Sequence, residues 1–267
     1  MPKKANLDHI TIVLHQPKRS ENIGAVARVL CNMGIGGLRI IKPQNYHLPD
    51  VLKMATHGAV EIVEQIDFFE DLKSALAPFR YIVGTTARLG GQRPAVTTPR
   101  KMAEELIPIS IKNKVAIVFG PEDRGLSNED IRYCHRLVNI PTAKFSSLNL
   151  AQAVMVICHE LFAASLEANP EDIPRLATRD ELEKMYEQLK EILIRINYIN
   201  PENPDHWING LRRFFNRLPL RAKEVSIIRG ICRQINWYGG KSFNDGFSLK
   251  QKKHSQSDGI HFEKELK

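Results

Sequence analysis

The chain has 267 residues, of which 43% are hydrophobic and 25% are charged, an ordinary globular composition. Lysine and arginine outnumber aspartate and glutamate by 38 to 30, and this net charge of +8 favours a polyanionic partner without deciding among RNA, DNA and an anionic membrane. No stretch approaches the roughly 20 apolar residues of a membrane span, and the N-terminus has no signal-peptide core, so we expect a soluble protein without membrane contact.

The four cysteines are scattered, and no two of them lie within three residues of each other. Cys31, Cys134, Cys158 and Cys232 therefore show no zinc or redox spacing. Each falls in an apolar or helical stretch, where a reduced core cysteine is the usual state. The nine histidines form no H-x-x-x-H pair. We expect no metal site, no disulfide framework and a cytoplasmic location.

Apolar periodicity predicts strands alternating with helices between residues 10 and 166. In chain order we expect a strand at Ile10–Leu14, a helix at Asn22–Met33 between a Ser20 cap and a Gly34 stop, a strand at Leu38–Ile41, and helices at Asp50–Ala55 and Phe68–Leu76 with room for a short strand at Val60–Val63. A strand at Tyr81–Thr85, a helix at Lys101–Leu106, a strand at Val115–Phe119, a helix at Asn128–Tyr133, a strand at Leu137–Ile140 and a helix at Leu148–Leu166 follow. This alternation predicts an α/β fold whose parallel sheet is covered on both faces and binds ligands beyond the carboxyl ends of its strands.

The rest of the chain predicts a small all-α extension behind a linker. The segment Glu167–Pro174 is polar and contains prolines, as linkers often do. Helices are expected at Arg179–Tyr198, His206–Asn216 and Arg221–Trp237, and they either form a bundle or lean on the first domain. We divide the chain into a disordered lead (1–8), an α/β domain (9–166), a linker (167–176), a helical extension (177–238) and a polar tail from Gly239 that we expect to be disordered (239–267).

Three segments at the predicted strand–helix junctions carry polar residues. The first holds Asn22 and Arg28, less than two helical turns apart, although the pattern alone favours a surface arginine and a helix-starting asparagine. The second, Phe119–Ser127, is a glycine loop after a strand, and such loops are also common as plain turns. The third, Ile140–Ala153, contains Ser146 or Ser147 as a helix cap, which leaves Asn149 in the first turn without an explanation.

Other common chemistries do not fit these segments. The second loop has neither the spacing nor the Lys-Ser or Lys-Thr pair of a phosphate-binding P-loop. The G-x-G-x-x-G pattern of dinucleotide-binding folds and the G-x-S-x-G turn of hydrolases are both absent from the sequence. A hydrolase based on Ser147 would also need a histidine base nearby, and the sequence indicates none.

Taken together, the three segments resemble the three motifs of the SpoU branch of the SPOUT RNA methyltransferases. The matching patterns are N-x-G-x-x-x-R at Asn22–Arg28, V-F-G-x-E-x-x-G-L at Val118–Leu126, and I-P with S-S-L-N-L-A at Ile140–Ala151. V-G-T-T-A-R at Val83–Arg88, G-L-R-R-F-F-N-R at Gly210–Arg217 and I-I-R-G-I at Ile227–Ile231 are similar to one subgroup, the bacterial tRNA cytidine/uridine 2′-O-methyltransferases acting at position 32 of the anticodon loop. The resemblance covers about residues 8–238.

The resemblance implies a C-terminal trefoil knot in the α/β domain, S-adenosyl-L-methionine as cofactor, and a homodimer whose active site lies between subunits. The residues it places around the cofactor are Thr85, Thr86, Ala87, Gly120, Glu122, Gly125, Leu126, Ile140, Ser147 and Leu148. The catalytic residues it implies are Arg28, Asn22, Ser147 and Asn149. Arg28 of one subunit would act beside the methyl group held by the other, as a phosphate or oxyanion clamp or as the base. Glu122 has an alternative role in stabilising its loop.

The expected substrate is tRNA, with ribosomal RNA as the main alternative and a non-catalytic RNA-binding protein as a more distant one. Seven basic residues and one acidic residue lie between His206 and Arg233. We expect Arg28, Arg212, Arg213, Arg217 and Arg221 to contact RNA, and the interleaved Trp207, Phe214 and Phe215 to lie mostly in the core.

Overall fold

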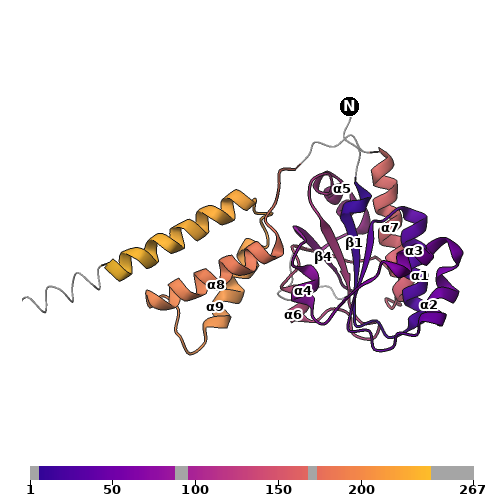
Figure 1. Ribbon diagram of the computed structural model, residues 1–267, viewed down its shortest axis with the longest axis horizontal. Helices are drawn as coiled ribbons and strands as arrows, with labels where there is room; N and C mark the ends of the chain where they lie inside the picture. Colours follow the sequence, from indigo (N-terminus) through magenta and orange to yellow (C-terminus); the bar gives the residue numbers. More distant parts are fainter. Residues whose placement is uncertain (1–5, 88–95, 168–172, 242–267) are drawn as a thin grey trace, which may run out of the picture.

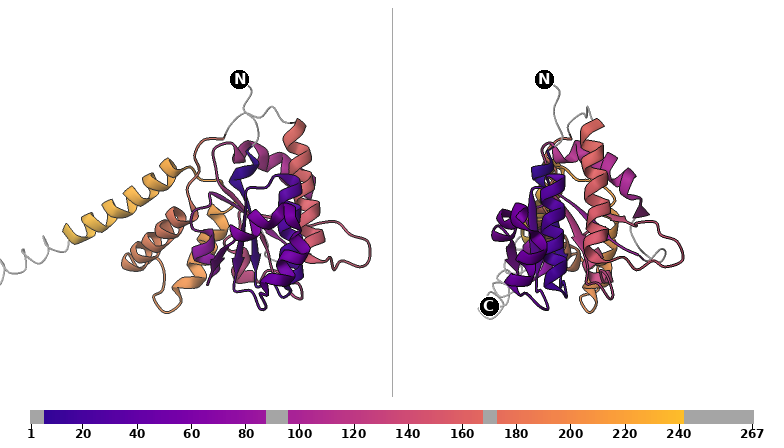
Figure 2. Two further views of the ribbon diagram at one scale, coloured as in Figure 1. Left: turned by 45° about the vertical axis from the view of Figure 1, so that its right-hand side comes forward. Right: turned by 90° about the vertical axis from the view of Figure 1, so that its right-hand side faces the viewer.

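The computed structural model describes residues 6–87, 96–167 and 173–241 (Figure 1). A twisted sheet with helices on both faces forms the first part of the chain, and the helices after residue 173 stand beside it. Figure 2 shows that these later helices lie on the side of the sheet opposite to α7 (Leu150–Glu167) and α1 (Ser20–Met33). The helix at 222–241 projects away from the sheet in both figures.

The described strands form one seven-stranded sheet in the order β3-β2-β1-β6-β4-β7-β5. All of its strand pairs are parallel. The strands are β1 (Ile10–His15), β2 (Gly37–Ile41), β3 (Asp67–Phe69), β4 (Tyr81–Thr85), β5 (Val96–Thr97), β6 (Val115–Phe119) and β7 (Arg136–Val138). All five residues of β6 are buried, as expected for a central strand covered on both faces. The predicted parallel α/β sheet is therefore confirmed.

The helices divide unequally between the two faces of the sheet. The larger core lies between the sheet and α1, α2 (Leu48–Ala55), α3 (Val60–Glu64), α5 (Pro99–Ser110) and α7. The smaller core lies under α4 (Leu72–Leu76) and α6 (Asn128–Ile131). Two short 3-10 helices, Leu7–His9 and His57–Ala59, complete the described elements of this domain. Leu7 packs against the larger core, so the end of the predicted disordered lead is ordered.

Three predictions about local structure are wrong. The segment Val60–Val63 lies in the helix α3 rather than in a strand, and Val63 is its buried residue. The helix predicted over Phe68–Leu76 is instead the strand β3 followed by α4, which Asp71 caps by accepting from the backbone N–H of Ser74 at 2.8 Å. Ser20 is the first residue of α1 rather than its cap, and its hydroxyl accepts from His47 N at 2.8 Å.

The extension has a hydrophobic core of its own. Its helices are α8 (Arg179–Arg195), α9 (Pro204–Phe215) and the helix at 222–241. Leu182, Met185 and Ile208 are among the buried residues of this core, which contains no residue of the sheet domain. The last helix continues through Gly239 to residue 241, beyond the predicted end at Trp237. The rest of the predicted tail, and residues 168–172 of the predicted linker, lie outside the described residues.

His135 is a buried titratable group at the start of β7. Its Nδ1 accepts from the backbone N–H of Ile82 at 3.1 Å, and its ring stacks on Tyr81 with 5.0 Å between centroids. Burial, helped by the charge of Arg179, lowers the pKa of His135 from 6.5 to about 3. The imidazole is therefore neutral in the folded protein at every physiological pH.

This burial predicts a pH-dependent stability. The unfolded chain binds a proton near pH 6.5 that the folded chain binds only near pH 3, so the free energy of unfolding is fully retained above pH 6.5 and falls as the pH drops toward 3. The slope from this one group approaches about 1.4 kcal/mol per pH unit. Urea unfolding of the wild type and His135→Gln at several pH values measures it, because glutamine accepts the same hydrogen bond without titrating. Parallel curves for the two proteins would contradict the prediction.

Candidate functional site

The largest concentration of predicted site residues lies at the carboxyl edge of three neighbouring strands. β6, β4 and β7 are adjacent in the sheet, and the segments that follow them enclose a pocket of about 360 Å³. The first wall begins at Thr85, the last residue of β4, and continues through Thr86 and Ala87. The second begins at Phe119, the last residue of β6, and runs to Leu126, and the wall after β7 includes Ile140 and Ser146–Leu148. Leu150 and Ala153 of α7 complete the lining. The predicted location of the site, beyond the carboxyl ends of parallel strands, matches this pocket.

The loop after β6 depends on two glycines for different reasons. A Cβ atom at Gly120 would lie 2.3 Å from the carbonyl carbon of Gly125 and 2.4 Å from Leu126 N, so the loop folds back on itself only where no side chain intervenes. Gly125 has φ +65°, a left-handed conformation that other residues rarely adopt. The N–H of Gly125 donates to Pro121 O at 2.8 Å and closes the turn. The glycine loop is thus a wall of the pocket as well as a turn.

The segments after β4 and β7 are tied to each other. The backbone N–H of Thr86 donates to Val138 O at 2.9 Å, and the side-chain amide of Asn139 donates to Thr86 O at 2.8 Å. The hydroxyl of Thr85 donates to Val118 O at 3.0 Å, which connects β4 to β6 at the same edge. These bonds hold the pocket walls in register. Asn139 was not among the predicted residues, because the predicted strand ran to Ile140, whereas β7 ends at Val138 and leaves Asn139 directly after it.

Asn149, rather than a serine, caps the helix α7. Its side-chain oxygen accepts from the backbone N–H of Ala151 at 2.9 Å and of Gln152 at 3.4 Å, and α7 begins at Leu150. The prediction that Ser146 or Ser147 caps this helix is therefore wrong. Both serines instead line the pocket. Since the cap uses a different side chain, the two hydroxyl groups lie where a bound ligand would meet them.

A chain of hydrogen bonds joins the three predicted motifs. The amide of Asn149 donates to Asn22 Oδ1 at 3.0 Å, and the amide of Asn22 donates to Glu122 Oε1 at 3.0 Å. Both carboxylate oxygens of Glu122 also accept from the backbone N–H of Lys18, at 3.2 and 3.0 Å. Glu122 also lines the pocket. The same carboxylate therefore stabilises the loop after β6 through its bonds to Lys18 and faces the pocket. The two roles that the sequence left open for this residue are compatible.

The structure brings together most of the predicted site residues. Lining the pocket are all ten residues predicted to surround the cofactor: Thr85, Thr86, Ala87, Gly120, Glu122, Gly125, Leu126, Ile140, Ser147 and Leu148. Asn22 and Asn149 reach it through Glu122. Arg28 is exposed on α1 and does not line the pocket of its own chain. Arg88, which belongs to the matched segment after β4, lies outside the described residues.

The predicted RNA-contacting arginines of the extension differ in their surroundings. Arg213, Arg217 and Arg221 are exposed. The guanidinium of Arg212 instead turns inward, where its side chain is 15% exposed and pairs with Glu183 at 2.5 Å. Trp207 and Phe214 are 51% and 57% exposed, so the prediction that the aromatics lie mostly in the core is wrong for these two. Phe215 is the one of the three that packs against the extension's core.

The charged groups Asp123 and Arg124 at the pocket rim have polar or charged partners. Lys18 Nζ lies 2.8 Å from Asp123 Oδ2, and hydrogen bonding to Lys18 lowers the pKa of Asp123. Arg124 donates to Gln16 Oε1 at 2.5 Å. No histidine, cysteine or lysine is among the described lining residues. Within the described ranges no group of three or more His, Cys, Asp or Glu is arranged to hold a metal ion. The polar lining of the pocket thus consists of hydroxyl groups, two carboxylates and one arginine, which can align bound groups by hydrogen bonds.

Comparison with known proteins identifies the family to which this chain belongs. The family described as SpoU rRNA Methylase matches residues 9–159, which include all three motifs. The family described as tRNA methyltransferase TrmJ, C-terminal domain, matches residues 180–246. The chain belongs to the SpoU methylase family and, within it, to the group of the TrmJ methyltransferases.

Similar proteins cover nearly the whole chain. The tRNA (cytidine/uridine/adenosine-2′-O-)-methyltransferase TrmJ of Pseudomonas aeruginosa is 34% identical over 242 residues, which are 85% of this chain and 94% of that protein. The tRNA (cytidine/uridine-2′-O-)-methyltransferase TrmJ of Escherichia coli is 33% identical over 86% of this chain and 96% of its own. The crystal structure of TrmJ from Z. mobilis ZM4 superimposes with a TM-score of 0.74 at 28% identity. The match covers 85% of this chain and 98% of that one.

The Asn149 cap of α7 should contribute to the free energy of unfolding. Asn149→Ala removes the acceptor for two helix N–H groups and should lower the free energy of unfolding by about 1 kcal/mol. Asn149→Ser keeps a capping oxygen but loses the amide that donates to Asn22, so it should cost only a few tenths of a kcal/mol. Urea unfolding measures both. Equal losses for the two variants would show that the contact with Asn22, and not the cap, stabilises this junction.

Proposed function

We propose that this chain transfers a methyl group from S-adenosyl-L-methionine to a ribose 2′-hydroxyl of tRNA. The main support for the proposal is the pocket, because three segments with the family motifs converge there at one edge of the sheet. The similar proteins from Pseudomonas aeruginosa and Escherichia coli are named as tRNA 2′-O-methyltransferases, which supports tRNA as the substrate. The target we propose is cytidine or uridine at position 32 of the anticodon loop, as the resemblance implies.

The lining residues fit the proposed cofactor. Leu126, Ile140 and Leu148 provide an apolar surface for a planar base, and Thr85 with Thr86 adds polar groups beside it. A volume of about 360 Å³ lies within the range of small-molecule sites. The absence of a side chain at Gly120 lets the loop close around this space. When bound, S-adenosyl-L-methionine supplies an activated methyl group on a sulfonium centre.

The residues of this chain would align the ribose and stabilise its oxygen. A ribose hydroxyl is a weak acid, so attack by its oxygen needs a base or a positive charge nearby. Ser147 lines the pocket, while Asn22 and Asn149 are held in place by their mutual hydrogen bond. We assign these three to positioning and Arg28 to a clamp on phosphate or oxyanion, because a guanidinium stays protonated in proteins.

We further propose a homodimer in which Arg28 serves the pocket of the partner subunit. Arg28 is exposed and does not line the pocket of its own chain.

By length and composition alone α7 meets the criterion for a membrane-spanning helix, but it packs on α1 and α5 through residues such as Val154 and Leu161. Its exposed side carries Phe162 and Leu166. This apolar strip beside α1 supports a subunit interface rather than a membrane contact.

The trefoil knot, the tRNA contacts of the extension and the cellular compartment are further expectations for this chain. We propose that the segments Val83–Ala87, Gly120–Leu126 and Ile140–Asn149 are the loops of a trefoil knot, and that the extension binds tRNA through exposed arginines such as Arg213 and Arg217. All four cysteines are free, which supports the reducing cytoplasm as compartment, and Cys31 is exposed rather than in the core.

Methylation of tRNA tests the proposed function. Labelled S-adenosyl-L-methionine and unmodified tRNA should give ribose methylation in the anticodon loop. Arg28→Ala should lower kcat/KM by about 100-fold or more, the loss typical of a charge that acts on a developing oxyanion, and Arg28→Lys should recover part of it. Label that appears only in ribosomal RNA would keep the chemistry and overturn the substrate. Absence of both transfer and cofactor binding would support a non-catalytic RNA-binding protein.

Mixed dimers test the shared site. Arg28→Ala and Gly120→Val should each be inactive, the first for lack of the clamp and the second for lack of a formed pocket. Co-expression of the two should restore about a quarter of the wild-type activity, since half of the dimers are mixed and each has one intact site. No recovery in dimers verified by light scattering would place Arg28 and the pocket in the same subunit.

A further inference from the structure

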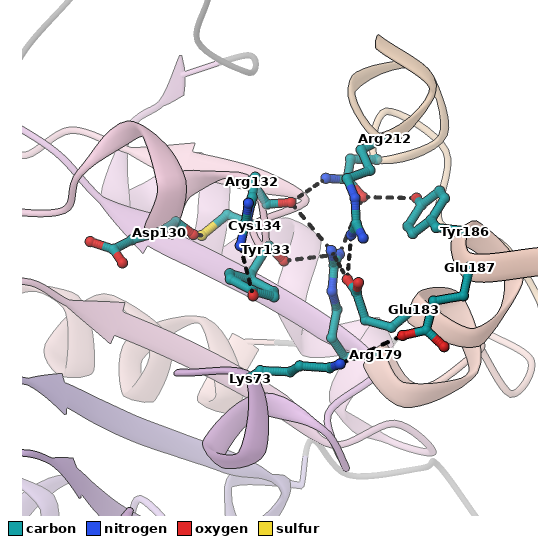
Figure 3. Close-up of polar contacts among 11 residues, drawn as sticks. Lys73, Asp130, Arg132, Tyr133, Cys134, Arg179, Glu183, Tyr186, Glu187 and Arg212 are labelled. Carbon is teal, nitrogen blue, oxygen red and sulfur yellow. Dashed lines mark hydrogen bonds and ion pairs between the residues drawn. The ribbon is translucent and has the colours of Figure 1, made fainter. Parts of the chain in front are cut away.

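The junction between the sheet domain and the extension is polar. The two parts have separate hydrophobic cores, and buried charged groups lie between them (Figure 3). The central group is Arg179 at the start of α8, whose side chain is fully buried. The backbone N–H groups of Arg179 and Asp180 donate to Phe79 O at 2.8 Å and Ala77 O at 3.2 Å. The first turn of α8 therefore sits directly on the sheet domain.

The Arg179 guanidinium contacts three segments at once. It donates to the backbone carbonyls of Tyr133 at 3.3 Å and Arg132 at 3.4 Å, which follow α6 in the sheet domain. It also donates to Glu183 Oε1 at 2.5 Å on α8 and to Asn216 Oδ1 at 3.3 Å directly after α9. Figure 3 shows this side chain pointing into the middle of the cluster. A planar group with five donors can hold several acceptors in one fixed geometry, which a lysine cannot.

The end of α9 is held by two further side chains. Arg212 donates to Glu183 Oε1 at 2.5 Å, and its guanidinium lies 4.5 Å from the ring centroid of Tyr186. The amide of Asn216 donates to Arg132 O at 2.8 Å, which links α9 directly to the sheet domain. Burial raises the pKa of Glu183, but the hydrogen bonds and charges of Arg212 and Arg179 outweigh burial and lower it. Glu183 is thus ionised and shared by two arginines.

This cluster sets where the exposed arginines of the extension point. Arg212 and Asn216 are four residues apart on one face of the last helical turn, and both turn inward. Arg213 follows Arg212 on α9, about 100° further around the helix, and Arg217 follows Asn216 in the turn directly after α9; both arginines are exposed. Anchoring the first pair therefore fixes the direction of the second pair relative to the sheet domain.

We propose that Arg179, Glu183, Arg212 and Asn216 are positioning residues that fix the RNA-binding face of the extension relative to the pocket of the same subunit. The inference rests on the proposed function, since it assumes that the exposed arginines bind tRNA. An apolar junction would hold the two parts together equally well, because a buried ion pair adds little net stability over well-packed apolar residues. The shared carboxylate adds a fixed orientation. Arg212 acts through this orientation and not by contacting RNA itself.

The test compares two variants of α8 with the same change in charge. Glu183→Gln removes the buried shared carboxylate, whereas Glu191→Gln removes an exposed one on the same helix. Loss of a negative charge by itself strengthens binding to a polyanion, so Glu191→Gln should bind tRNA equally or slightly more tightly. Glu183→Gln should bind tRNA at least about fivefold more weakly and show a raised KM for tRNA with kcat nearly unchanged, because misplacing a contact costs binding. Affinity for S-adenosyl-L-methionine should stay at the wild-type value in both.

A second variant separates orientation from folding. Arg179→Lys keeps the charge but loses the planar donor set, and it should weaken tRNA binding in the same direction while circular dichroism shows the full helix content. Faster amide hydrogen exchange at Arg179 and Asp180 should accompany it, since their N–H groups bond to the sheet domain. Equal tRNA affinity for Glu183→Gln and Glu191→Gln would overturn the inference. A wild-type chain that binds tRNA in this comparison but methylates no RNA would instead overturn the proposed function alone.

Discussion

The parallel pairing of β4 with β6 and β7 is the constraint on which the site depends. Parallel strands end at the same edge of a sheet, so three segments that are far apart in the chain meet at one place. The bonds between Thr86 and Val138 and between Thr85 and Val118 then hold the three segments in register. A pocket with preformed walls follows from backbone geometry, before any functional side chain is considered.

Polar side chains at that edge serve structure and function together. Asn149 caps α7 with its oxygen and binds Asn22 with its amide, so one residue orders the helix start and the neighbouring motif. Glu122 in turn holds the backbone of Lys18. Because these groups satisfy one another, they cannot move independently, and Ser147 is left to face the pocket.

Buried charged groups restrict the junction between the sheet domain and the extension. Its buried charges would cost free energy if they were unpaired, so the orientation of the extension is restricted to the one that satisfies them. Figure 1 shows the outcome, with the extension standing against the α4 and α6 side of the sheet. The face that carries α7 is left open, where the proposed second subunit would lie. One face of the sheet domain thus binds the extension and the other is available to a partner.

The sequence by itself determined the α/β class, the strands β1, β4 and β6, and, through the resemblance of its motifs to a known family, ten of the residues that line the pocket. These depend on local patterns, since a buried strand is a short apolar run and motif glycines are needed by their own loop. The structure of Val60–Val63 and the cap of α7 depend on which neighbours each segment packs against. The inward turn of Arg212 was decided only by the tertiary structure, because an arginine on an amphipathic helix looks the same in sequence whether its partner is RNA or a buried glutamate on another helix.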